Sequence, residues 1–208
     1  MTPSQANKKP RAAPVNDDWW GETAVCIGCG PSLVKQDIEL IKGKARVIAI
    51  NNAFMLAPFA DILYACDSKW WGWWYHKMPD FEGEKWTQDI NAARRYQLRW
   101  IEGRAGPGLS TDPRVIHNGH NSGYQAINLA YHKGACRIVL LGYDMKFGDD
   151  ERAHFFGDHP DKVRSNYAPW LKAYKTIAEQ DKIEIINATR DTALDCFPRI
   201  ALEDIAWN

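Results

Sequence analysis

The feature that most constrains the fold is an apolar run that ends in a glycine-rich turn. Residues 24–33 read Ala-Val-Cys-Ile-Gly-Cys-Gly-Pro-Ser-Leu, and an amphipathic segment follows them. This order predicts a strand, a tight turn and a helix. Gly28 and Gly30 allow positive φ angles and close backbone approach, and Pro31 suits the first turn of a helix. The N–H groups of the turn, Ser32 included, are predicted to bind an anion such as a nucleotide phosphate.

A second interpretation of this turn stays open. It contains neither the Gly-x-Gly-x-x-Gly pattern of dinucleotide-binding proteins nor the lysine of the common nucleotide-binding loop. A plain tight connection in an α/β fold is therefore equally consistent with the residues.

Apolar runs and helical segments alternate from residue 23 onward. Expected strands cover 24–27, 45–50, 62–66, 96–101, 137–141 and 183–186, and expected helices cover 33–42, 68–77, 121–133 and 167–180. Such alternation indicates parallel strands joined by crossover helices. We predict an α/β fold with a Rossmann-like, mostly parallel sheet flanked by helices. It forms a single domain over residues 19–208, and residues 1–18 form a disordered tail.

Charge and apolar patterning restrict the partners. The chain has 26 Lys and Arg against 26 Asp and Glu, so no overall field favours nucleic acid or an anionic membrane. No apolar run approaches the roughly 20 residues that span a bilayer, and the first residues contain no signal-peptide core. The five cysteines are odd in number, which suits a reducing compartment. We expect a cytoplasmic protein without a membrane partner and leave a homo-oligomer open.

Polar residues follow several expected strands, where the carboxyl ends of a parallel sheet line a ligand crevice. Besides the turn of residues 28–32, the candidate nucleotide-binding residues at strand ends are Asn51, Asn52, Tyr143 and Asp144, and two more, Ser122 and Gly123, open the expected helix 121–133. The asparagine amides fit a ribose, a base edge or a phosphate. Turn-forming asparagines and a helix-capping Ser122 are the alternatives.

Asp67 follows the expected strand 62–66. It could hold a divalent metal through ligand phosphates, but it lacks the second carboxylate that usually accompanies such a site. Capping of the next helix is therefore the favoured role.

Residues 145–161 form a long polar loop, and loops of this length often act as lids. The loop contains His154 and His159, and an imidazole can act as a general base for an acceptor hydroxyl. Together with Asp158 they also resemble a partial metal site, and incidental surface histidines are a further alternative.

Residues 70–76 read Trp-Trp-Gly-Trp-Trp-Tyr-His. Helical spacing places Trp70, Trp73 and Trp74 near one face, and Trp71 and Tyr75 away from it. Part of this aromatic surface is therefore expected to be exposed, as an acceptor platform, a stacking surface or a subunit contact. Core packing is the alternative.

Five short motifs stand in one order: Gly28-x-Gly30-Pro31-Ser32-Leu33, Asn51, Ser122-Gly123, Gly142-x-Asp144 and Phe156-Gly157-x-His159. Over residues 23–194 this order resembles the bacterial sialyltransferases that use CMP-activated sugars, together with the related motility-accessory-factor and phage glycosyltransferase-like proteins. The resemblance implies nucleotide contacts at Gly30, Ser32, Asn51, Ser122 and Gly123. It also implies a metal-free mechanism with His159 as the general base. Where this family often has asparagine, the chain has Cys29.

The resemblance predicts a nucleotide-sugar-dependent glycosyltransferase with a CMP-sugar as the expected donor and no other cofactor. The acceptor hydroxyl stays open among a glycan, a small molecule and a modified DNA base. The glycine turn also resembles that of archaeal pterin pyrophosphokinases, so a magnesium-dependent nucleotidyl or diphosphoryl transferase using Asp67 is the alternative. A non-catalytic nucleotide-binding or interaction module is the third.

Overall fold

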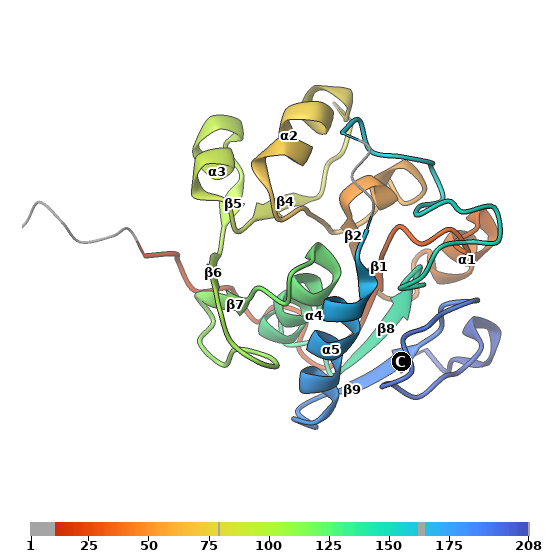
Figure 1. Ribbon diagram of the computed structural model, residues 1–208. Helices are drawn as coiled ribbons and strands as arrows, with labels where there is room; N and C mark the ends of the chain where they lie inside the picture. The colour runs from red at the N-terminus through yellow and green to blue at the C-terminus, as the bar shows by residue number, and fades with distance from the viewer. Residues whose placement is uncertain (1–10, 79, 162–164, 208) are drawn as a thin grey trace, which may run out of the picture.

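The computed structural model describes residues 11–78, 80–161 and 165–207, and these form an α/β domain (Figure 1). A seven-stranded sheet has the order β5-β4-β3-β2-β1-β8-β9, and every neighbouring pair is parallel. Its strands are β1 (Thr23–Ile27), β2 (Arg46–Ile50), β3 (Ile62–Tyr64), β4 (Glu84–Thr87), β5 (Arg99–Trp100), β8 (Arg137–Leu141) and β9 (Glu184–Asn187). The predicted Rossmann-like fold is confirmed.

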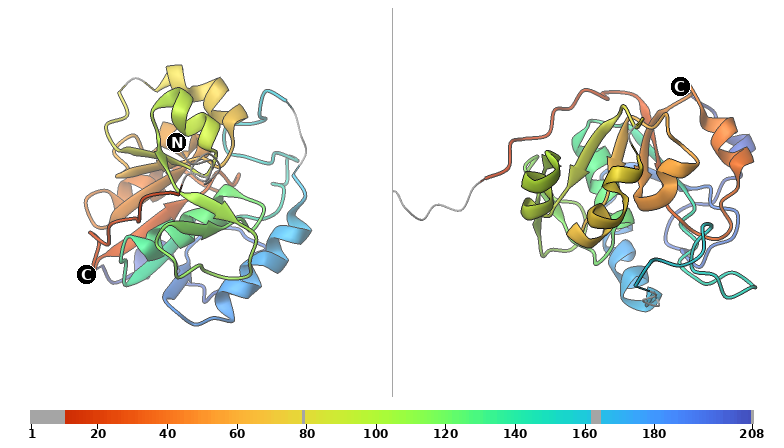
Figure 2. Two further views of the ribbon diagram at one scale, coloured as in Figure 1. Left: turned by 90° about the vertical axis from the view of Figure 1, so that its left-hand side faces the viewer. Right: turned by 90° about the horizontal axis from the view of Figure 1, so that it is seen from above.

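Helices cover both faces of the sheet (Figure 2). On one face lie α1 (Lys35–Ile41), α2 (Ser68–Trp74) and α3 (Ile90–Tyr96), and on the other lie α4 (Ser122–His132) and α5 (Tyr167–Ala178). Short 3-10 helices cover Asn51–Met55 (η1), Tyr75–Lys77 (η2) and Leu202–Asp204 (η3). Among the described helices, none combines the length and the apolar character needed to cross a membrane.

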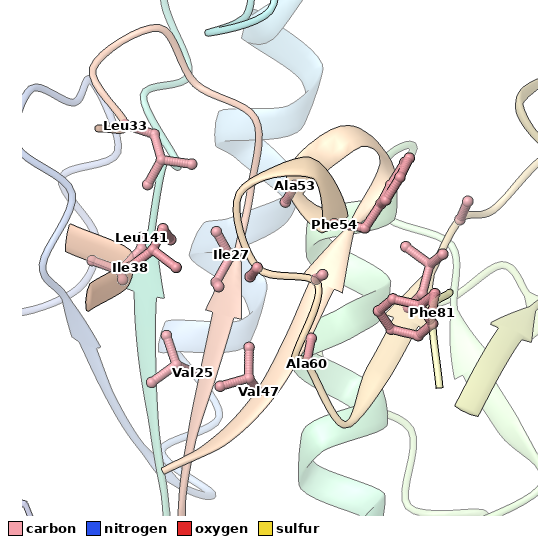
Figure 3. Packing of buried hydrophobic residues seen from close by; sticks show 14 of the residues in the cluster. Val25, Ile27, Leu33, Ile38, Val47, Ala53, Phe54, Ala60, Phe81 and Leu141 are labelled. Atoms are coloured by element: carbon pink, nitrogen blue, oxygen red, sulfur yellow. The ribbon is translucent and has the colours of Figure 1, made fainter. Parts of the chain in front are cut away.

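After their first residue, the central strands β1, β2 and β8 are apolar, because both of their faces are buried. Val25 and Ile27 of β1 contact the cluster that includes Ile38 of α1 (Figure 3). Ala24 and Cys26 of the same strand contact the opposite cluster, which includes residues of α4. This alternation is the two-residue period of a strand, and it gives the domain one core on each side of the sheet.

Several predicted boundaries shift by two or three residues, and two of these shifts have a clear local cause. The helix expected over 33–42 begins only at Lys35, because a turn at residues 31–32 and two residues without regular structure precede it. The strand expected over 96–101 is reduced to β5, because Tyr96 ends α3 and Gln97 adopts a left-handed conformation with φ 55°. The left-handed conformation of Gln97 thus ends α3 inside the segment that was expected to be a single strand.

Three strands and one helix were not predicted from the sequence. They are β4, α3 and the two strands of a small parallel sheet, β6 (Glu102–Arg104) and β7 (Val115–His117). The small sheet lies in the region that was expected to be a loop. All three strands have only three or four residues, and β4 and β6 are rich in charged or polar residues, so hydrophobic periodicity does not reveal them.

The expectation of a disordered tail is wrong for residues 11–18, and residues 1–10 lie outside the described residues. Figure 2 shows the segment after residue 10, in dark red, running along the domain. Ala12 and Val15 are buried, and the N–H of Val15 donates to the carbonyl oxygen of Pro113 at 2.8 Å. Asp18 pairs with Nζ of the buried Lys133 at 2.7 Å. Burial of two apolar side chains and this ion pair hold the segment against the domain.

Candidate functional site

The strand order reverses beside β1, which marks the ligand position in such a sheet. From β1 the chain proceeds outward through β2, β3, β4 and β5, and it then returns to place β8 on the other side of β1. Parallel α/β sheets bind ligands outside the carboxyl ends of the strands at this point. The turns that follow β1 and β8 are residues 28–32 and 142–144, so the topology predicts a ligand site beside these turns.

A cavity of about 720 Å³ opens there. Its wall comes from the ends of β1, β2 and β8, the first turns of α2 and α4, the 145–161 loop and the start of α5. The candidate residues in this wall are Gly28, Gly30, Asn51, Asp67, Ser122, Gly123, Tyr143, Asp144, His154 and His159. Pro31, Ser32 and Asn52 are not in the wall, so their predicted direct contact with a ligand is not supported.

The glycines of the first turn are needed for close packing. Neither Gly28 nor Gly30 has a positive φ, contrary to the conformational part of the prediction. A Cβ on Gly28 would lie 2.5 Å from the carbonyl oxygen of Gly142, and one on Gly30 would overlap Oδ1 of Asp144. The two turns at the switch point therefore fit together only because these side chains are absent.

Three N–H groups of this turn donate to other parts of the protein. Gly28 donates to the carbonyl oxygen of Leu141 at 2.7 Å, and Gly30 donates to that of Gly142 at 2.8 Å. The N–H of Ser32 donates to Oδ2 of Asp144 at 2.8 Å. Helix α1 begins only at Lys35, so its N-terminus does not lie at the turn. The prediction that the N–H groups of this turn are free for a phosphate is therefore wrong for Gly28, Gly30 and Ser32.

The carboxyl group of Asp144 is buried at the floor of the cavity. Oδ2 accepts the Ser32 N–H, whereas Oδ1 has no hydrogen-bond partner within the described residues. Burial raises the pKa of Asp144 to about 6. Its neighbour Tyr143 is also buried, and the Tyr143 hydroxyl donates to the carbonyl oxygen of Gly123 at 3.1 Å. Residues 143 and 144 thus join the end of β8 to both β1 and α4.

Asn51 and Asn52 have different environments, although both were predicted to bind the nucleotide. Asn51 has φ 49°, so the chain turns sharply from β2 into η1. Asn51 lines the cavity, whereas Asn52 is fully buried and its Oδ1 accepts a hydrogen bond from Nε1 of Trp70 at 2.8 Å. The site assignment of Asn52 is therefore corrected to a structural one.

The N-terminus of α4 brings a second predicted residue beside Asn51. Asn121 caps the helix by accepting the N–H of Tyr124 at 2.9 Å, so Ser122 is not the cap. Oγ of Ser122 accepts the N–H of Cys66 at 3.1 Å and donates to Oδ1 of Asn51 at 3.4 Å. Residues 71 positions apart thus meet at one point of the cavity wall.

Asp67 caps α2, as the favoured interpretation held. Its Oδ1 accepts the N–H of Trp70 at 2.9 Å, and the residue also lines the cavity. Within the part of the chain that the structure describes, no three His, Cys, Asp or Glu side chains are grouped so that they could hold a metal ion.

The 145–161 loop brings both histidines to the cavity; in Figure 1 the loop is drawn in cyan. It is attached to the first turn by the N–H of Phe155, which donates to the carbonyl oxygen of Cys29 at 3.0 Å. Burial, and after it the charge of the nearby His159, lower the pKa of His154 to about 4. Burial also lowers the pKa of His159, partly opposed by three aspartates. Both rings are therefore neutral and able to accept a proton at neutral pH.

The tryptophan cluster divides between core and cavity, but not as helical spacing predicted. Trp71 is fully buried and Trp70 nearly so, whereas Trp73 and Trp74 are only partly buried. The prediction that Trp71 faces away from the core is wrong, because its Nε1 donates to the carbonyl oxygen of Ala65 at 3.1 Å and its ring lies in the same buried cluster as residues of α3. Trp73 lines the cavity and stacks on His159, with ring centroids 6.1 Å apart.

Several residues of the wall were not predicted. They are Lys69 of α2, Lys146 of the loop, Asn121, and Tyr167 and Trp170 of α5. Lys146 pairs with Asp191 at 2.5 Å, and Lys69 with Asp161 at 3.9 Å. The start of α5 could have been suspected, because it follows directly after the loop, but no motif in the sequence marks Tyr167 or Trp170.

The structure defines a Rossmann-like α/β domain with a cavity at the switch point of its sheet. No protein-family model and no curated protein matches the sequence. The MAf glycosyltransferase from Magnetospirillum magneticum AMB-1 has a similar structure, with a TM-score of 0.66 and 11% sequence identity. The similarity covers 96% of this chain but only 37% of that chain.

A second similar structure is the sialyltransferase CstII from Campylobacter jejuni, which was solved in complex with a substrate analogue, cytidine-5'-monophosphate. The TM-score is 0.55 and the identity 16%, over 88% of this chain and 86% of that chain. This chain therefore has the fold of these two glycosyltransferases, as the resemblance predicted.

Proposed function

We propose that this chain is a glycosyltransferase domain that transfers a sugar from a nucleotide-sugar donor, a CMP-sugar, to an acceptor hydroxyl. One observation carries the proposal. At the switch point of a fold shared with two glycosyltransferases, a single cavity brings together Asn51, Ser122 and His159. The complex of CstII with cytidine-5'-monophosphate is the reason for choosing CMP as the nucleotide.

In this proposal the donor lies along the ends of β1, β2 and β8. The side-chain amide of Asn51 contacts the nucleotide, because it supplies both donors and an acceptor. The phosphate lies at the N-terminus of α4, where Ser122 and Gly123 line the cavity. The first N–H groups of a helix have no partners within the helix and carry a partial positive charge. This position replaces the turn of residues 28–32, where the N–H groups of Gly28, Gly30 and Ser32 already have partners.

His159 is the proposed general base. It takes the proton of the acceptor hydroxyl as that oxygen bonds to the anomeric carbon of the sugar. The bond from this carbon to the phosphate oxygen breaks, and the nucleotide leaves with the electron pair. His154 is the weaker candidate because a pKa of about 4 makes its ring a poor proton acceptor. The 145–161 loop would exclude water, which favours transfer over hydrolysis.

Isothermal calorimetry with CMP tests the donor site. Asn51→Ala is expected to weaken CMP binding by about 1–3 kcal/mol, because a buried hydrogen-bonding group of the ligand loses its partner. Asn91→Ala is the matched control, since Asn91 is exposed on α3 and does not line the cavity. Equal affinity in the two variants would place the nucleotide elsewhere.

The release of CMP from a CMP-sugar tests the reaction. His159→Ala is expected to slow turnover by about 10²–10⁴-fold while CMP affinity is kept, and His154→Ala is expected to have a smaller effect. The reaction is expected to continue in EDTA. Loss of activity in EDTA that magnesium restores would instead favour the metal-dependent transferase using Asp67, and a larger loss in His154→Ala would make His154 the base.

A further inference from the structure

The imidazole of His159 is held by aromatic rings. Trp73 of α2 stacks on it with ring centroids 6.1 Å apart and an angle of 28° between the planes. His154 and Phe156 of the 145–161 loop contact it edge to face, at centroid distances of 4.8 and 5.2 Å. One contact thus comes from a helix that packs on the sheet, and two come from the loop itself.

No hydrogen bond orients the buried nitrogen of this ring. Nδ1 of His159 is buried and has no hydrogen-bond partner within the described residues. In many catalytic histidines, a carboxylate or a carbonyl group at one ring nitrogen fixes the orientation of the ring. Here the stacked indole is the contact from outside the loop that defines the plane of the imidazole.

Trp73 itself is well placed to act as a fixed support. The preceding residues of α2, Trp70 and Trp71, are buried in the core, and Asp67 caps the start of the helix. Nε1 of Trp70 donates to Oδ1 of Asn52, and Nε1 of Trp71 donates to the carbonyl oxygen of Ala65. Trp73 therefore projects from an anchored helix into the cavity, whereas His159 belongs to a segment without helix or strand structure.

We propose that Trp73 is a positioning residue for His159: its indole holds the imidazole of the 145–161 loop in the orientation in which it can reach the acceptor hydroxyl. The role of His159 as a base rests on the proposed function, whereas the stacking of Trp73 on His159 is seen in the structure itself. A displacement of about 1 Å in a reacting group can reduce a rate by about 100-fold. Loss of the stacked ring therefore acts on turnover through the position of His159.

The same contact shields His159 from water. Burial is the largest influence on the pKa of His159 and lowers it, whereas the charges of Asp158 and Asp161 in the loop and of Asp67 at the start of α2 raise it. His154 is the other titratable ring in contact, and Lys69 lies 3.9 Å from Asp161. Removal of the indole leaves these charges in place and exposes the ring. The pKa of His159 is therefore expected to rise.

The test combines Trp73→Leu, Trp73→Phe and the control Trp20→Leu, which makes the same change at a side chain that is 82% exposed. Proton NMR titration of His159, assigned with a His159→Gln variant, is the readout that does not depend on activity. We expect an upward shift of the His159 titration in Trp73→Leu, a small shift in Trp73→Phe and none in Trp20→Leu.

The kinetic readout is the release of CMP from a CMP-sugar. We expect kcat to fall by about 10–100-fold in Trp73→Leu, with CMP affinity unchanged and most of the rate restored in Trp73→Phe. An unchanged His159 titration in a folded Trp73→Leu variant would overturn the proposal, as would unchanged turnover in an active enzyme. If the wild-type protein releases no CMP, the proposed function fails, and the titration alone decides whether Trp73 holds His159.

Discussion

Among single residues, the glycines of the turn after β1 matter most for the shape of the cavity wall, because a side chain there would collide with the end of β8. The turn after β1 fits under the end of β8 because Gly30 leaves room for Oδ1 of Asp144 and for the carbonyl oxygen of Gly142. The carboxylate of Asp144 in turn accepts the N–H of Ser32. Gly30 and Asp144 therefore form one packing unit, although 114 positions separate them.

Gly30→Ala is expected to reduce the free energy of unfolding by about 1–3 kcal/mol, because the added methyl group overpacks this unit. Gly72→Ala is the control: Gly72 lies within α2, and a Cβ there would meet only the Tyr96 hydroxyl at 3.7 Å. Alanine in a helix stabilises by up to about 1 kcal/mol relative to glycine. Urea unfolding of both variants measures the difference, and equal stabilities would show that the turn tolerates a Cβ.

At the element scale, α3 illustrates a helix that local signals define better than periodicity does. Oδ1 of Asp89 accepts the N–H groups of Asn91 and Ala92, both at 2.8 Å, and Gln97 ends the helix in a left-handed conformation. The helix has only seven residues. So short a helix shows no clear apolar period, and it depends strongly on its cap.

Asp89→Ala is expected to reduce the free energy of unfolding by about 0.5–2 kcal/mol, the usual effect of removing an N-cap. Asp89→Asn keeps an oxygen acceptor and is expected to retain most of the stability. Chemical denaturation followed by circular dichroism compares the two variants. A full loss in the asparagine variant would show that the negative charge matters more than the cap hydrogen bonds.

At the scale of the whole molecule, two buried groups make stability depend on pH in opposite directions. The folded pKa of His154 is about 4 against an ordinary value of 6.5, so the unfolded chain binds more protons between these values. Stability therefore falls as pH decreases from 6.5 towards 4. The pKa of Asp144 rises from 3.8 to about 6, so the folded state binds more protons there and stability falls as pH increases through that range.

Variants separate the two contributions. His154→Gln is expected to remove a loss of about 1–3 kcal/mol between pH 6.5 and 4, discounted for partial exposure of the ring. Asp144→Asn is expected to change the pH dependence in the opposite sense between about pH 4 and 6. Urea unfolding at several pH values gives each slope. A His154→Gln variant with the wild-type slope would contradict the burial of this imidazole.

Much of the molecule follows from local patterns in the sequence. The apolar runs at β1, β2 and β8 and the helical segments between strands define a parallel sheet, because a strand buried on both faces must be apolar throughout. The polar residues after those runs then lie at one edge of the sheet. For this reason Asn51 and Asp144 could be assigned to one site from their order alone, whereas Ser122 was assigned from the start of an expected helix and from the family resemblance.

Only the tertiary structure decided how those residues are used. In the folded chain the Ser32 N–H, which was predicted to bind a phosphate, donates to Asp144. The side chain of Asn52 lies in the core, whereas Asn51 lines the cavity. Trp73 stacks on His159. The physical reason is that hydrogen bonds and ring contacts between distant segments depend on distance and direction, which residue spacing along the chain does not contain. Periodicity, by contrast, is a local property, so the apolar strands β1, β2 and β8 and the sheet edge at which they end could be predicted from the sequence.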